Sequence, residues 1–127
     1  MRFQEYSIDE AIKRNLDSMG FKRPTDIQFK SIPPILRNED VLAIAQTGTG
    51  KKAAFAIPII HLIQERKRKL RTSGIQCIVM VPTRELALQI TKVFNQLEKG
   101  TRVTSISIFG GVEQDPQIKK LLEGVDI

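Results

Sequence analysis

Near its middle the chain reads Val41-Leu42-Ala43-Ile44-Ala45-Gln46-Thr47-Gly48-Thr49-Gly50-Lys51. Residues 41–45 form a continuous apolar run, which is typical of a strand buried on both faces. The glycine-rich turn after this run lets successive backbone N–H groups surround a phosphate, and a lysine and a helical pattern follow it. This arrangement predicts a phosphate-binding loop, or P-loop. The residues expected at the phosphates are Thr47, Gly48, Thr49, Gly50 and Lys51.

One position departs from the P-loop pattern. The residue after the lysine is normally Ser or Thr, whose hydroxyl binds Mg²⁺, but here it is Lys52. An ammonium group has no lone pair for a metal and repels a dication. Lys52 therefore either contacts the phosphates in place of the ion or turns to solvent. In both cases we expect weakened Mg²⁺ binding, no metal ligand at this position, and impaired metal-assisted hydrolysis.

Two further apolar runs of strand type lie at residues 75–81 and 103–109. They alternate with helical patterns, and this order implies a parallel sheet with right-handed crossovers. We therefore predict an α/β fold with a parallel sheet and flanking helices. Residues 125–127 begin another strand, so the domain is expected to be truncated.

The sequence also predicts helices in its first half. A capping box at residues 7–10 begins the first helix, which Gly20 ends. A second helical segment covers residues 25–36, and we expect Pro33-Pro34 to interrupt it. Pro58 is expected to kink or end the helix that follows the P-loop.

The second half holds two more helical patterns. Apolar residues recur at helical spacing within residues 83–100. Asp115 and Pro116 are expected as the cap and the first turn of a last helix, which Gly124 ends. His61 is expected to be a partly buried helix residue without a catalytic role.

The composition limits the class of protein. The chain has 127 residues and one cysteine, Cys77, which suits a single domain. A lone cysteine forms no internal disulfide and no metal cluster, so we expect a reducing compartment and an inert core thiol. No apolar run approaches the ~18 residues of a membrane span, and no signal peptide is visible. We therefore expect a soluble cytoplasmic protein with no membrane partner.

Much of the positive charge lies in one segment. Residues 65–71 contain five basic residues and one acidic residue, a net +4 within the chain's formal +6. Two interpretations stay open: a solvated helix end and loop, or a surface that binds RNA or protein.

Four short motifs occur in an order that resembles the DEAD-box RNA helicases. Residues 20–28, with Phe3 upstream, look like the Q motif of that family, and 45–51 look like its motif I. Residues 82–87 look like motif Ia, and 110–111 like the GG element. The resemblance implies a RecA-like P-loop nucleoside triphosphatase domain. Within the N-terminal part of such a domain, residues 1–38 would form the Q-motif region and residues 39–127 the P-loop core.

The resemblance implies an ATP or ADP site. In the family the Q-motif glutamine, here Gln28, reads adenine, because its carboxamide offers both a donor and an acceptor. Phe21 would stack on the base and Arg23 belongs to the same binding set. From local sequence alone, Gln28 fits a capping box with Thr25 equally well. Phe3 is expected to pack under the motif.

The resemblance also implies contacts with the backbone of single-stranded RNA. The residues at the matching positions are Pro82, Thr83, Arg84, Gly110 and Gly111. A hydroxyl, a guanidinium and helix N–H groups can meet an anion at such a strand-to-helix junction. The alternative for Arg84 is a surface salt bridge. Backbone contacts of this kind would carry no sequence information.

The family's Asp-Glu-Ala-Asp motif and its second RecA-like domain, which would be a partner of this one, are absent from these residues. We therefore expect the ATP- and RNA-binding portion of a helicase, without turnover on its own and with no complete catalytic set beyond the phosphate contact of Lys51. The alternatives are a non-catalytic RNA- or protein-binding module with a degenerate P-loop, and a P-loop ATPase that acts on DNA or protein.

Overall fold

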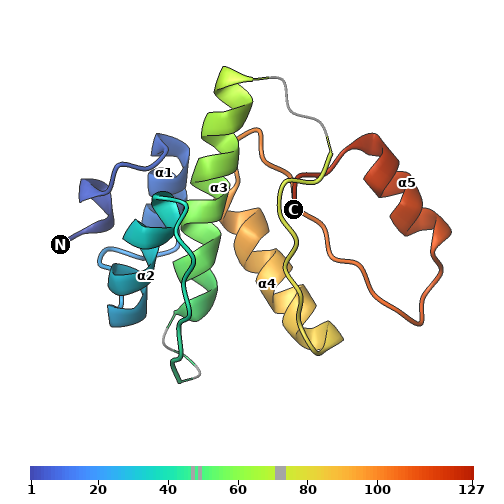
Figure 1. The fold of residues 1–127 in the computed structure, drawn as a ribbon, viewed down its shortest axis with the longest axis horizontal. Coiled ribbons are helices and arrows are strands. Elements are labelled where there is room, and N and C mark those ends of the chain that lie inside the picture. The colour runs from blue at the N-terminus through green and yellow to red at the C-terminus, as the bar shows by residue number, and fades with distance from the viewer. Residues whose placement is uncertain (47, 49, 71–73) are drawn as a thin grey trace.

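The computed structural model describes residues 1–46, 48, 50–70 and 74–127. A short 3-10 helix, η1, and five α-helices follow one another along the described chain. Their bounds are η1 Phe3–Glu5, α1 Glu10–Ser18, α2 Asp26–Leu36, α3 Lys51–Lys69, α4 Arg84–Leu97 and α5 Asp115–Glu123. The helix α3 stands at the centre, with η1, α1 and α2 on one side, α4 on the other, and α5 far from α3 (Figure 1).

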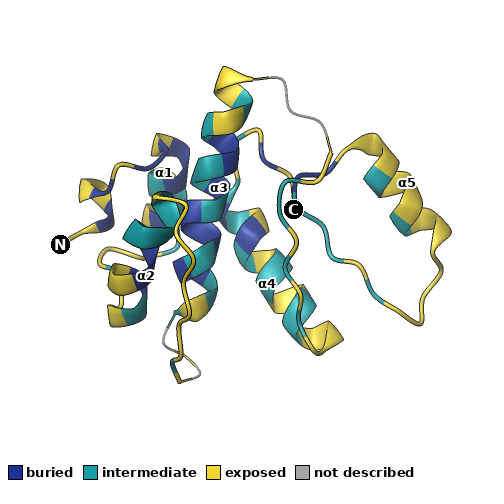
Figure 2. Cartoon of the chain, in the orientation of Figure 1, coloured by how far each residue is buried: buried dark blue, intermediate teal, exposed yellow. Residues whose placement is uncertain are grey.

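The core surrounds the middle of α3. Ile57 and Ile60 of this helix are fully buried, and η1 and α1 pack against it with Phe3 and Leu16. Phe94 of α4 closes the core from the other side. Figure 2 shows this concentration of buried residues around α3, whereas no residue of α5 is buried. The helices around α3 are therefore well packed, whereas α5 buries none of its residues.

The predicted helices are all present, but two begin at other residues than expected. The first helix has Asp9, not Ser7, as its N-cap, because the Asp9 carboxylate accepts the N–H of Ala11 at 2.9 Å. The last helix has Gln114 as its N-cap, and Asp115 is its first helical residue. The predicted end at Gly124 is confirmed.

The interruption expected at Pro33-Pro34 is wrong, and so is an end of the helix at Pro58, whereas a kink at Pro58 stays a prediction. Pro33 and Pro34 lie within the last turn of α2, where the helix ends two residues later at Leu36 in any case. Pro58 lies within α3, which continues to Lys69. Each proline removes one backbone hydrogen bond, but Pro58 is fully buried, so packing offsets that loss.

The predicted strands do not form in the part of the chain that the structure describes. Residues 41–45, 75–81 and 103–109 carry no strand assignment. The parallel sheet is therefore a correction to the sequence-based prediction, and its physical reason is a lack of neighbours. Leu42, Ile44 and Met80 are each 88–90% exposed. They belong to continuous apolar runs, which are typical of strands buried on both faces by neighbouring elements.

Three backbone segments nevertheless begin a sheet-like contact at the C-terminus. Asp126 O accepts the N–H groups of Gln76 and Cys77 at 2.7 and 3.0 Å. On its other side, Asp126 N–H donates to Thr104 O at 3.1 Å, and Ile127 O accepts from Ile106 N–H at 3.1 Å. Residues 125–127 thus lie between the starts of the other two segments. None of the described helices is long and apolar enough to cross a membrane.

Candidate functional site

The glycine-rich turn leads directly into the N-terminus of α3. Gly50 is the N-cap residue, with φ +84°, and no side chain caps the helix there. The first-turn N–H groups of a long helix therefore lack a side-chain acceptor, which is the arrangement that favours an anion. Gly48 also has φ +84°. Thr47 and Thr49, both predicted phosphate contacts, lie outside the described residues.

Lys51 is the first residue of α3, and its ammonium group has N–H donors that could bind a ligand. Its side chain is exposed, and its ammonium group donates to the carbonyl oxygen of Ala45 at 2.6 Å. Because an ammonium group has three N–H donors, two remain for phosphate oxygens. The contact also closes the turn between residues 45 and 51.

Gln28 joins α2 to the P-loop. Its side chain is almost fully buried: Oε1 accepts the N–H of Thr25 at 2.9 Å, and Nε2 donates to Gly50 O at 3.1 Å. The capping-box interpretation is therefore confirmed. Among the described residues, one N–H and one lone pair of the carboxamide have no partner, so adenine reading by Gln28 stays a prediction.

The rest of the Q-motif-like stretch forms the loop between α1 and α2. Phe21 is 40% exposed and Arg23 is exposed. Phe3 is fully buried, packs beside Tyr6, and its N–H donates to Lys22 O at 3.1 Å. The expected packing role of Phe3 is confirmed, and it supports the loop that carries Phe21.

Position 52, where the P-loop pattern has the Mg²⁺ ligand, is a lysine whose ammonium group offers no lone pair to a metal. The side chain of Lys52 is half-buried in the first turn of α3, and within the described residues it has no hydrogen-bond or ion-pair partner. The same part of the chain contains no group of His, Cys, Asp or Glu side chains suited to a metal ion. Phosphate contact and a turn to solvent both stay predictions for Lys52.

The two predicted RNA-contact elements meet. Arg84, at the start of α4, donates from its guanidinium to Gly110 O at 2.9 Å and lies 5.4 Å from the centre of the Phe109 ring. Gly111 follows with φ +73°. No acidic side chain in the described ranges pairs with Arg84, so the salt-bridge alternative is wrong.

Pro82 and Thr83 precede this contact and are exposed, as are Arg84, Gly110 and Gly111. Thr83 caps α4, because its hydroxyl accepts the N–H of Leu86 at 3.2 Å. The hydroxyl of Thr83 still has a proton to donate, and the Arg84 fork has further N–H groups. The five predicted residues are therefore all exposed, and Thr83 and Arg84 offer hydrogen-bond donors beside the two glycines.

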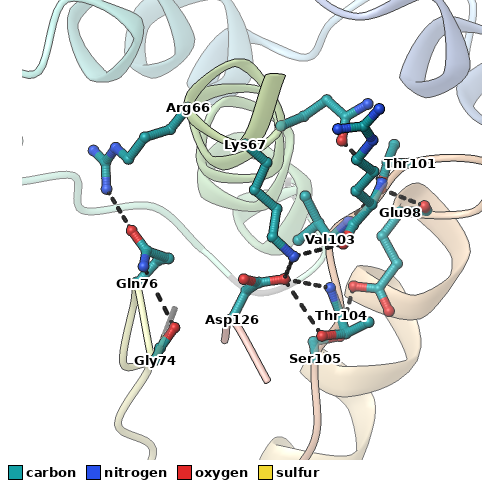
Figure 3. A network of polar contacts seen from close by, with 12 residues as sticks. Arg66, Lys67, Gly74, Gln76, Glu98, Thr101, Val103, Thr104, Ser105 and Asp126 are labelled. Carbon is teal, nitrogen blue, oxygen red and sulfur yellow. Dashed lines mark hydrogen bonds and ion pairs between the residues drawn. The ribbon is translucent and has the colours of Figure 1, made fainter. Parts of the chain in front are cut away.

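The basic run has a structural role that neither sequence interpretation included. Lys67 lies 2.7 Å from Asp126 Oδ2 and donates to Arg102 O at 2.8 Å, and Arg66 donates to Gln76 Oε1 at 2.9 Å (Figure 3). Asp126, almost fully buried, also accepts the N–H of Thr104 at 3.0 Å. These contacts tie the end of α3 to three later segments.

A second contact ties the same end of α3 to the N-terminal region. Arg68 lies 2.6 Å from the buried Asp9 Oδ2, and His61 Nδ1 accepts the N–H of Asp9 at 3.0 Å. Burial lowers the pKa of His61, in agreement with this acceptor role. The expected half-buried helix histidine is confirmed. In the sequence, Asp9 was only a member of the predicted capping box, and Asp126 had no signal beyond its apolar neighbours.

Partial burial raises the pKa values of two side chains, Cys77 and Glu98. Burial raises the pKa of the half-buried Cys77 thiol, which keeps it protonated and unreactive. Burial also raises the pKa of Glu98 to about 7, opposed by the hydrogen bond from Ser105 Oγ at 2.8 Å. Ser105 Oγ also lies 2.9 Å from Asn95 Oδ1. A hydroxyl has only one proton to donate. If Glu98 is protonated, it donates to Ser105 Oγ, and Ser105 can then donate to Asn95 Oδ1.

The comparisons with known proteins agree with this geometry. The DEAD/DEAH box helicase family matches residues 25–127. The chain is 36% identical over 126 residues to the ATP-dependent RNA helicase CshA of Listeria monocytogenes, with 99% of this chain and 23% of that protein covered. The chain thus spans about a quarter of the length of this curated relative.

Solved structures show the same backbone path. A DEAD box protein from Methanococcus jannaschii matches with TM-score 0.85 and 40% identity over 95% of this chain and 32% of that one. A hypothetical ATP-dependent RNA helicase from Sulfolobus tokodaii matches with TM-score 0.80 and 32% identity over 94% and 33%. The molecule therefore matches part of a DEAD-box RecA-like domain. More particularly, the chain belongs to the DEAD/DEAH box helicase family.

Proposed function

We propose that this chain is the ATP- and RNA-binding portion of a DEAD-box ATP-dependent RNA helicase and does not turn ATP over on its own. The observation that carries the proposal is the hydrogen bond from Gln28 to Gly50 O, which joins the predicted adenine reader to the phosphate loop. In this proposal residues 1–38 form the Q-motif region and residues 39–127 the P-loop core. RNA is the proposed partner because the curated relative is an RNA helicase.

Different residues of the chain would bind the phosphates and the adenine base of the nucleotide. The two remaining N–H groups of Lys51 and the first-turn amides of α3 would bind the phosphates, while the remaining carboxamide N–H and lone pair of Gln28 would meet adenine N7 and N6. Phe21 would stack on the base. Mg²⁺ in related P-loop enzymes neutralises charge on the phosphates, but Lys52 offers it no ligand, so no step is assigned to the metal here.

A calorimetric titration with ADP and GDP tests the nucleotide part of the proposal. We expect ADP to bind at least about tenfold more tightly than GDP, and Gln28→Glu, which loses the N–H donors, to remove this preference. Arg37→Gln, on the exposed end of α2, is the control. Equal affinity for ADP and GDP in the unmodified chain would refute the role of Gln28.

The absence of turnover has its own measurement. We expect no phosphate release from ATP above the uncatalysed rate when single-stranded RNA is added, because no carboxylate of the Asp-Glu-Ala-Asp type is present in the sequence. Helicase-like turnover by the purified chain contradicts this part of the proposal.

A second candidate function is a non-catalytic RNA-binding module, which the meeting of Arg84 with Gly110 favours. In that case Arg84→Ala weakens RNA binding and nucleotide has no effect on it. Lys92→Ala, on the same helix and exposed, makes the same change in charge and is the matched control. If ADP changes the RNA affinity of the unmodified chain, the helicase proposal holds and the module is excluded.

A further inference from the structure

The side chain of Gln117, in the first turn of α5, binds the backbone of Phe109. Its Oε1 accepts the N–H of Phe109 at 2.8 Å, and its Nε2 donates to Phe109 O and to Glu113 O, both at 3.3 Å. A carboxamide has two N–H donors beside its carbonyl oxygen, so both donors of Gln117 are used in these contacts. The contacts join the two ends of the segment that connects Phe109 to α5.

The same segment contains the Gly110-Gly111 pair and meets Arg84. The guanidinium of Arg84 donates to Gly110 O at 2.9 Å and lies 5.4 Å from the centre of the Phe109 ring. A Cβ atom built at Gly111 would lie 3.4 Å from the same guanidinium. Gln117 therefore holds the backbone of the residue whose ring and whose next carbonyl group contact Arg84.

Apolar packing contributes little to the conformation of this segment. Residues 110–116 are all exposed, and no residue of α5 is buried (Figure 2). Within residues 110–123, only Gln117 and Leu121 are half-buried. An exposed pair of glycines has wide conformational freedom unless other contacts restrict it. The hydrogen bonds of Gln117 and Arg84 therefore supply most of that restriction.

We infer that Gln117 is a positioning residue for RNA binding, which holds Phe109 and the Gly110-Gly111 pair in the conformation that meets Arg84 and the RNA backbone. The inference rests on the proposed function, in which Arg84 and the glycine pair contact RNA. Its physical basis is preorganisation, because a segment that is ordered before binding loses less conformational entropy when it binds. Since the protein backbone already uses both N–H donors of Gln117, this residue acts through the segment and not as a donor to phosphate.

Fluorescence anisotropy of the complete chain with a labelled single-stranded oligouridylate measures the effect. Gln117→Met keeps the length and the helix propensity of the side chain but removes its carboxamide. We expect this change to weaken RNA binding at least about threefold and to leave ADP affinity, measured by calorimetry, within about twofold. Gln114→Met is the matched control, because the Gln114 side chain is exposed and makes no hydrogen bond within the described ranges. We expect the control to bind RNA as the unmodified chain does.

Three outcomes of these measurements overturn the inference. The first is equal RNA affinity of Gln117→Met and Gln114→Met. The second is an equal loss of RNA and ADP affinity in Gln117→Met, because it indicates general damage to the fold instead of a changed RNA site. The third is an unchanged rate of amide exchange at Phe109 in Gln117→Met, since this N–H donates to Gln117 and should exchange faster once the segment is released.

A double-mutant cycle with Arg84→Ala separates this inference from the proposed function. Because Gln117 acts through the segment that meets Arg84, we expect the double variant to lose less RNA affinity than the product of the two single losses. A loss equal to that product overturns the inference, since the two residues then act independently. If Arg84→Ala leaves RNA affinity unchanged, the proposed RNA site is wrong and the inference falls with it. If Arg84→Ala weakens RNA binding and Gln117→Met does not, only the inference is wrong.

Discussion

Gly50 lies where any larger residue would collide with Gln28. A Cβ atom built there would lie 2.4 Å from Gln28 Nε2, and φ is +84°. Gly48 has the same φ but no described atom within 4 Å of such a Cβ. An alanine at Gly48 would therefore meet backbone strain alone, whereas an alanine at Gly50 would meet backbone strain and a steric clash. We expect Gly48→Ala to cost about 1 kcal/mol and Gly50→Ala about 2–3 kcal/mol, because the second change also displaces a buried, hydrogen-bonded side chain.

Urea unfolding of the two variants measures this difference, and ADP affinity is the second readout. The contact of Gln28 with Gly50 is the physical link between the adenine and phosphate parts of the proposed site, so Gly50→Ala should also weaken ADP binding. If both alanine variants lose the same free energy of unfolding, the close approach of Gln28 has no energetic weight.

Lys52 decides the proposed dependence on metal. In the unmodified chain we expect ADP affinity to change less than about twofold when Mg²⁺ replaces EDTA, because an ammonium group offers no ligand. Lys52→Thr restores a hydroxyl at this position, and we expect Mg²⁺ then to strengthen ADP binding about tenfold. Lys69→Thr, at the other end of α3, is the control for the change in charge. Metal-independent binding by Lys52→Thr would show that the position is not a ligand position.

At the scale of the element, the end of α4 contains a titratable contact. Burial raises the pKa of Glu98 to about 7, above its unfolded value near 4.5, and the neighbouring Asp126 acts in the same direction. The folded state thus favours the protonated form. The stabilisation is fully present below about pH 4.5 and is lost as the pH rises through about 7.

Glu98→Gln removes this titration while it keeps a group that can donate to Ser105. We expect the free energy of unfolding of the unmodified chain to fall by about 1 kcal/mol more than that of the variant between pH 5.5 and pH 8, a value already reduced for the partial exposure of Glu98. Urea titrations at the two pH values measure it. Parallel pH profiles would contradict the raised pKa.

The helices were predictable because their signals are local. Apolar spacing and caps indicated α1, α2, α4 and α5, and the P-loop pattern indicated the start of α3. The strands were not predictable to the same degree, because a strand needs a neighbour that its own sequence does not contain. Residues 41–45 have the apolar pattern of a buried strand and yet no paired neighbour in the described chain.

In the whole molecule, too, local patterns predicted part of the site, whereas contacts between distant segments were not predictable. Order and spacing of motifs indicated Arg84 and the Gly110-Gly111 pair, and the structure brings them together. Sequence reasoning missed the contacts that join distant segments, because no local pattern links residues as far apart as Lys67 and Asp126, separated by 59 positions. The basic run therefore looked like a surface feature, although part of it holds the C-terminal residues in place.

The ion pair between Lys67 and Asp126 should accordingly carry stability for the whole chain. The Asp126 side chain is 6% exposed, so Lys67→Met leaves a buried carboxylate without its cation. We expect a loss of about 2 kcal/mol in the free energy of unfolding, together with faster amide exchange at Gln76 and Ile106, whose N–H groups donate to residues 126 and 127. Lys69→Met, on the exposed side of the same helix end, makes the same chemical change without a buried partner. An equal loss in both variants would mean that the ion pair adds nothing beyond the general charge of the helix end, and the three segments would then be held by the backbone hydrogen bonds among them and by packing.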